Sequence, residues 1–165
     1  MQVEVKEIVQ DYILITYDIP AKDWKTRANF IRKARSIGAM MYTASCWLLP
    51  YSESVFELAN EVATIGDAIV WKSHQDDKQK AYKITTSYEQ HLEARCQYIY
   101  QRLERAQEYM TAGKLKTAAK MGIKTGQLLS ELAQIAELFN KEWLKSRLGE
   151  LVAQWKEIYG EGKSG

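Results

Sequence analysis

One acidic residue stands out in this sequence as a candidate for metal chemistry. Asp18 lies in the triplet Tyr17-Asp18-Ile19, at the expected end of a strand and just before a helix. A carboxylate in that position could bind a divalent cation, and Mg²⁺ favours carboxylate and water ligands. The alternative is a structural role, in which Asp18 accepts hydrogen bonds from backbone N–H groups of the turn or pairs with Arg27.

A dense group of basic residues follows Asp18. Within fourteen residues there is a single acid, Asp23. At about 100° per residue, Lys25, Arg32 and Arg35 share one face of a helix. Such a face could bind the phosphates of a nucleic acid. The alternative is a solvated basic face offset by acidic helices. The group consists of Lys22, Lys25, Arg27, Arg32, Lys33 and Arg35.

A second basic stretch runs from residue 113 to residue 124 and contains no acid. The same reasoning makes it a candidate phosphate-binding segment. We therefore predict two groups of nucleic-acid-binding residues, namely Lys25, Arg32 and Arg35 in the first and Lys114, Lys116, Lys120 and Lys124 in the second.

Other reactive side chains point to structural roles. His74, Asp76 and Asp77 form a local cluster that could hold a metal, but no second histidine lies near them in sequence. Cys46 and Cys96 are far apart and show no CxxC spacing, so neither a disulfide framework nor a zinc site is expected. Burial on a strand and on a helix seam would leave both thiols inert.

The overall composition excludes several functional classes. The chain has 165 residues, 46% of them hydrophobic, and a formal net charge of +2. No run approaches the roughly 20 apolar residues of a membrane span, and the N-terminal stretch does not resemble a signal peptide. GxGxxG, GxxxxGK[ST], HExxH and GxSxG motifs are missing. We expect a cytoplasmic protein without a membrane partner, and we expect no catalysis.

The residues around these candidates predict an α+β module over residues 11–72. β-branched and aromatic runs indicate strands at 12–19, 40–43, 46–49 and 68–71, with a turn at Ala44-Ser45. Helical periodicity indicates helices at 23–37, capped by Asp23 and ended by Gly38, and at 52–65. The order of elements predicts a ferredoxin-like βαββαβ fold, with an antiparallel sheet of order 4-1-3-2 and both helices on one face.

The other face of that sheet must be solvated, docked by later helices, or used to form a dimer. Under the helix-covered face we expect one shared core. Its predicted members are Leu14, Ile31, Leu48, Leu58, Val62 and Ile69.

Residues 76–159 predict a long antiparallel helical hairpin. Apolar residues recur every three or four positions from Tyr82 to Met110, which indicates one long helix. Three glycines mark residues 111–126 as a connection. A second long helix is predicted at 127–159, with a change of phase, and so a possible bend, between Phe139 and Leu144.

The segments ITYDIP and SIGAMMYTASCWLLP, separated by the basic helix, resemble the N-terminal domain of the chromate-resistance regulator ChrB. The likeness spans roughly residues 11–159. The core is also similar to the C-terminal domain of the phenylacetate repressor PaaX and to the small CRISPR-associated nuclease-like subunit of the spacer-acquisition complex. The CRISPR likeness implies a two-fold dimer in which two copies of Asp18 approach each other and could share Mg²⁺.

The resemblance implies a non-catalytic regulatory or nucleic-acid-associated module of the ChrB N-terminal type, in stress or chromate-resistance regulation. Such a module would form a homodimer and need no cofactor. Two alternatives remain open. One is a metal-dependent nuclease that uses Asp18, and the other is a scaffold whose helices dock a protein partner.

Overall fold

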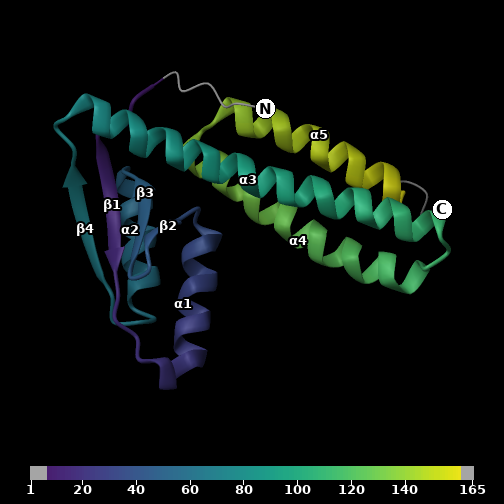
Figure 1. The fold of residues 1–165 in the computed structure, drawn as a ribbon, viewed down its shortest axis with the longest axis horizontal. Coiled ribbons are helices and arrows are strands. Elements are labelled where there is room, and N and C mark those ends of the chain that lie inside the picture. The colour runs from purple at the N-terminus through teal and green to yellow at the C-terminus, as the bar shows by residue number, and fades with distance from the viewer. Residues whose placement is uncertain (1–6, 161–165) are drawn as a thin grey trace. The chain divides into compact units, whose positions relative to one another are not determined.

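The protein is an α+β structure in which a four-stranded antiparallel sheet is followed by long helices (Figure 1). The computed structural model describes residues 7–160. The strands are β1 (Asp11–Thr16), β2 (Met40–Thr43), β3 (Cys46–Pro50) and β4 (Ile69–His74). The helices are the 3₁₀ turn η1 (Ala21–Asp23), then α1 (Trp24–Ser36), α2 (Glu53–Ala63), α3 (Lys78–Thr111), α4 (Leu115–Phe139) and α5 (Glu142–Tyr159).

The sheet has the strand order β2-β3-β1-β4, with every neighbouring pair antiparallel. This is the order 4-1-3-2 read from the opposite edge. The turn at Ala44-Ser45 joins β2 to β3, as predicted. β1 is shorter than expected and ends at Thr16, whereas β4 is longer and reaches His74. Asp18 therefore lies beyond the strand, and His74 lies on a strand instead of in a loop.

Different helices cover the two faces of the sheet. On one face, Phe30 of α1 packs against Tyr17, with ring centroids 4.6 Å apart, and Arg35 lies over Trp47. On the other face, the Tyr12 hydroxyl hydrogen-bonds to Thr85 Oγ1 of α3 at 2.9 Å. Successive side chains of a strand point to opposite faces. The N-terminal part of α3 therefore covers part of this second face, for which the sequence allowed solvent, later helices or a dimer partner.

The predicted core was wrong in its assignment of faces. Leu14 pairs with Leu48, and Ile15 pairs with Trp47. Because Trp47 faces α1, Ile15 lies on the helix-covered side, and Leu14 and Leu48 lie on the opposite side. Leu48 and Val62 are buried, whereas Leu14, Ile31 and Leu58 are half-buried and Ile69 is 57% exposed.

The ends of the first two helices differ in how they are capped. Ser52 accepts a hydrogen bond from Val55 N at 3.2 Å and so caps α2. Asp23 occupies the cap position of α1, but its side chain makes no capping hydrogen bond. Gly38 adopts φ of 91° just after α1, a conformation that glycine reaches without steric strain, and it ends the helix as predicted.

The helical part contains three helices, not the predicted hairpin of two. The expected connection over residues 111–126 is mostly the first half of α4, which begins at Leu115. The expected second helix is interrupted at Asn140, which has φ of 49° and caps α4, so the chain breaks where only a bend was expected. α5 then begins at Glu142.

Two of the glycines that suggested a connection instead allow α5 to pack closely on α4. A Cβ at Gly122 would lie 2.5 Å from the Tyr159 ring, and a Cβ at Gly126 would contact Trp155. The indole of Trp155 donates to Gly122 O at 3.1 Å, and Tyr159 donates to Ala118 O at 2.7 Å. Glycine is tolerated in this helix because close packing and hydrogen bonds compensate for its low helix propensity.

The chain divides into two compact units, residues 1–91 and residues 92–165, so the boundary falls inside α3. We call these the first and second units and describe each by itself. Within residues 7–160, no helix is both long enough and apolar enough to cross a membrane.

Candidate nucleic-acid interface

Helix α1 presents the first predicted group of basic residues to solvent. Lys25, Arg32 and Arg35 are all exposed, and so are Arg27 and Lys33. Only Phe30 and Ala34 of the helix are buried. The attachment of α1 to the sheet therefore uses a narrow stripe of the helix and leaves the rest of its surface available to a ligand.

Two of these cations, Lys25 and Arg32, have no acidic partner among residues 7–160. Among residues 7–160, no salt bridge joins Lys25 or Arg32 to a carboxylate. Arg32 donates to Asn29 Oδ1 at 2.6 Å, and the Lys25 ammonium lies 5.6 Å from the Trp24 ring centroid. Because no carboxylate neutralises Lys25 or Arg32, their positive charge remains available to phosphate.

Trp24 was not predicted as a site residue, and the structure places it in this basic surface. Helical periodicity counts Trp24 with Phe30 and Ala34 among the apolar positions of this helix, yet the side chain of Trp24 is 64% exposed. It occupies the first position of α1, immediately before Lys25. A tryptophan ring that is exposed beside cations can stack on a nucleic-acid base.

The second predicted group of basic residues lies at the start of α4. Lys114 precedes the helix, and Lys116, Lys120 and Lys124 recur every four residues along its exposed side. Ile123 is exposed on the same side, and Leu115 is exposed at the first position of the helix. The buried residues of α4, including Ala118 and Gly122, face the opposite way. This surface is thus both basic and partly apolar.

The two basic groups belong to different units of the chain. Lys25, Arg32 and Arg35 share one helix in the first unit, and Lys116, Lys120 and Lys124 share another in the second. Each group can be tested by itself.

Asp18 is exposed in the loop between β1 and η1. Neither structural alternative is observed, because no hydrogen bond or ion pair joins Asp18 to Arg27 or to any other residue in the described part of the chain. Residues 7–160 also contain no group of three His, Cys, Asp or Glu side chains arranged to hold a metal.

The cluster at His74 is an ion-pair network that includes one residue the sequence did not suggest. His74 Nδ1 lies 2.6 Å from Asp11 Oδ1, and Nε2 lies 3.2 Å from Asp76. The hydrogen bond to Asp11 raises the pKa of His74 above its ordinary value. Asp77 instead caps α3, accepting from Gln79 N and Lys80 N. Because both ring nitrogens face carboxylates, the imidazole is oriented for charge pairing.

The two cysteines have the features of structural thiols. Cys96 is fully buried, and burial raises its pKa to about 11. Cys46 is half-buried, and burial raises its pKa as well. Since the thiolate is the reactive form, both shifts disfavour reaction with oxidants.

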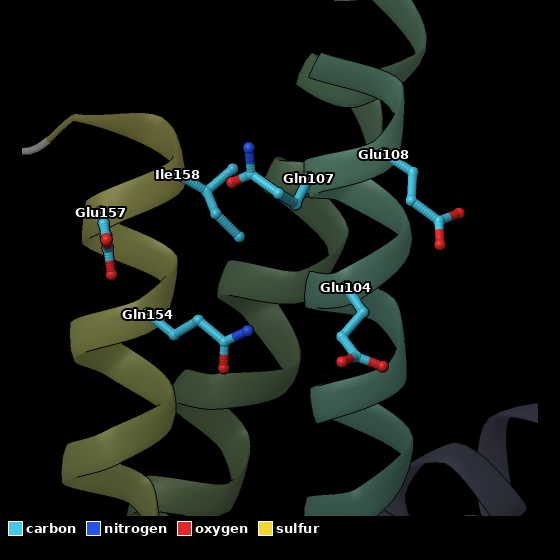
Figure 2. A pocket seen from close by; sticks show the side chains of 6 residues that line it. All are labelled: Glu104, Gln107, Glu108, Gln154, Glu157 and Ile158. Atoms are coloured by element: carbon cyan, nitrogen blue, oxygen red, sulfur yellow. The ribbon is translucent and has the colours of Figure 1, made fainter. Parts of the chain in front are cut away.

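The second unit also has a groove of about 610 Å³ between α3 and α5 (Figure 2). The side chains of Gln107, Gln154 and Ile158 point into the space between the helices. Three carboxylates and no cation line this groove, so it would repel phosphate and lies outside the predicted interface. The carboxylates are those of Glu104, Glu108 and Glu157.

Comparisons with protein-family models, with curated proteins and with solved structures found no match to this chain.

Proposed function

We propose that this protein is a non-catalytic, nucleic-acid-associated regulatory module that binds phosphates through helix α1. The observation that carries the proposal is the exposed basic surface of α1, where Lys25 and Arg32 have no acidic partner among residues 7–160. Basic residues that bind phosphates release condensed counterions, and this release supplies most of the non-specific affinity for nucleic acid. The basic side of α4 would contribute a second contact.

The proposed regulatory role follows the likeness to the N-terminal domain of ChrB, and it includes the ferredoxin-like classification of the first unit. The strand order β2-β3-β1-β4 and the contact between α1 and α2 support that classification. A homodimer is also part of the proposal. The exposed side chains of Ile69 and Trp71 on β4 offer apolar surface for it.

The proposal can be tested by the salt dependence of binding. The slope of log K against log salt is about −0.9 for each phosphate neutralised on duplex DNA. Replacing Lys25, Arg32 and Arg35 together with Ala should reduce that slope by about 2 to 3 units. Titration of the wild type and the variant with labelled duplex at several salt concentrations measures the change.

A matched control removes the same charge elsewhere in the first unit. Lys78, Lys80 and Lys83 are exposed near the start of α3. Their joint replacement with Ala changes the net charge equally and should leave the slope unchanged. Equal slopes for the two triple variants would mean that α1 has no special part in binding.

The rival nuclease hypothesis is separated by Asp18→Asn. A nuclease would lose Mg²⁺-dependent cleavage in this variant while it kept or improved its binding, because a negative charge near phosphate is removed. A non-catalytic module shows no cleavage in the wild type. If the wild type neither cuts nucleic acid nor binds it at about 50 mM salt, both hypotheses fail, and the scaffold hypothesis is the one left.

A further inference from the structure

Trp24 differs from the other tryptophans of the first unit. Trp47 is buried against α1, and Trp71 donates its indole N–H to Thr16 Oγ1 at 2.9 Å. Trp24 is 64% exposed, and the Lys25 ammonium lies 5.6 Å from the centroid of its ring. A large apolar ring in solvent contributes little to folding, so its presence beside a cation suggests a role in binding.

The surroundings of Trp24 combine an open ring with a row of positive charge. Ala28 follows Trp24 by one helical turn, and its small side chain is exposed. Lys25 and Arg32 lie roughly 10 Å apart along the helix axis and are exposed on the adjacent side. A ligand that crosses this surface meets the aromatic ring at one end and cations along the rest.

We infer that α1 binds single-stranded nucleic acid, with a base stacked on Trp24 and the backbone phosphates on Lys25 and Arg32. This inference rests on the proposed function and narrows its ligand. In a duplex, the faces of the bases are covered by their stacked neighbours, so a ring beside the phosphate contacts has no base face to meet. In a single strand the bases can turn outward, and they stack on aromatic side chains with little regard to sequence.

The test compares Trp24→Ala and Trp24→Phe with the wild type, using labelled oligothymidylate, oligouridylate and a DNA duplex. Trp24→Ala should weaken binding of a single strand by about 5- to 150-fold, the range of base–aromatic stacking. Trp24→Phe, which keeps an aromatic face, should recover most of this loss. Duplex affinity should stay within about twofold of the wild type, and the salt slope should not change, because the ring neutralises no phosphate.

Tyr42→Ala is the matched control, since Tyr42 of β2 is another exposed aromatic residue of the first unit and has no part in the proposed surfaces. It should leave single-strand affinity unchanged. A loss of single-strand affinity in Tyr42→Ala without one in Trp24→Ala would place the stacking on the sheet and overturn the inference. An equal loss of duplex and single-strand affinity in Trp24→Ala would also overturn it.

The outcomes separate this inference from the function on which it rests. If Trp24→Ala binds a single strand as the wild type does, while the Lys25, Arg32 and Arg35 variant binds weakly, the nucleic-acid function stands and stacking on Trp24 is refuted. If the wild type binds neither strand form at about 50 mM salt, both are refuted. Circular dichroism of each variant checks that the fold is retained.

Discussion

Helices α1 and α4 are both basic, yet they are held in the molecule in different ways. α1 buries two residues, Phe30 and Ala34. α4 buries seven, and α5 packs against it closely enough that Gly122 has no room for a Cβ. Charge on α1 is therefore largely independent of folding, whereas α4 must pack a core as well as present its lysines. Substitutions on α1 can therefore test binding with less effect on folding than substitutions on α4.

Charged residues in the second unit form ion pairs between helices that Lys25 and Arg32 of α1 lack among residues 7–160. Arg95 of α3 and Glu131 of α4 lie 2.6 Å apart, and Arg147 of α5 lies 3.3 Å from Glu93 of α3. These partly buried pairs join helices to one another, whereas the Lys25 ammonium has no such partner in the described residues. Charge thus stabilises packing in one unit and remains available at the surface of the other.

The largest effect should come from the residue that anchors α1. Phe30 is fully buried against Tyr17, so Phe30→Ala should lower the free energy of unfolding by about 3–5 kcal/mol. The exposed Trp24→Ala should change it by no more than about 0.5 kcal/mol. Chemical denaturation of both variants measures the contrast. If the two variants lose similar amounts of unfolding free energy, Trp24 is buried in solution. Its ring could then not stack on a base.

A smaller effect is expected for the ion pair between α3 and α4. Glu131→Gln should cost about 1.5–3 kcal/mol, the range for a hydrogen bond to a charged group. Glu137→Gln is the matched control on the same helix, because Glu137 is mostly exposed and 3.8 Å from Lys145. It should cost less than about 1 kcal/mol. Denaturation experiments measure the free energy of unfolding that each variant loses. Equal losses in Glu131→Gln and Glu137→Gln would mean that charge stabilises α4 no more than it stabilises α1.

The sequence predicted the four strands and the first two helices. It did not show which side chains of the strands point to which face of the sheet. The four central residues of β1, residues 12–15, are all aromatic or aliphatic because helices cover both sides of the strand, so alternation could not show which residues face α1. The glycines of α4 led to the wrong prediction of a connection over residues 111–126 for a related reason. Their partners Trp155 and Tyr159 lie 29 to 37 residues further along the chain, and local rules for glycine take no account of such contacts.

The candidate site was predicted in part. Helical spacing placed Lys25, Arg32 and Arg35 on a shared exposed side, because a 3.6-residue period suffices for that inference. Trp24 was missed because the same period assigned it to the buried side. No periodicity indicates where the sheet beneath a helix ends, so the exposure of its first residue had to come from the structure.

The smallest effect concerns the pH dependence of the surface charge network at the end of β4. The hydrogen bond from His74 to Asp11 raises the pKa of the imidazole above its unfolded value of about 6.5, and Asp76 adds to this. A raised pKa means that the folded state binds the proton more tightly. The stabilisation is therefore fully present below about pH 6.5 and is lost as the pH rises through the folded pKa.

Asp11→Asn removes the main cause of this shift, so the pKa of His74 should fall toward its ordinary value. NMR titration of the imidazole resonances measures this pKa, and His74→Gln assigns the resonances, since the chain has only two histidines.

Asp76→Asn should lower the pKa of His74 less than Asp11→Asn does, because Asp76 acts at a longer distance, 3.2 Å against 2.6 Å. The pKa of His74 should also move toward its ordinary value in high salt, which screens exposed charges. A pKa that Asp11→Asn leaves unchanged would mean that this pair does not persist in solution. Exposed charges in the first unit would then act independently of one another, at β4 as on α1.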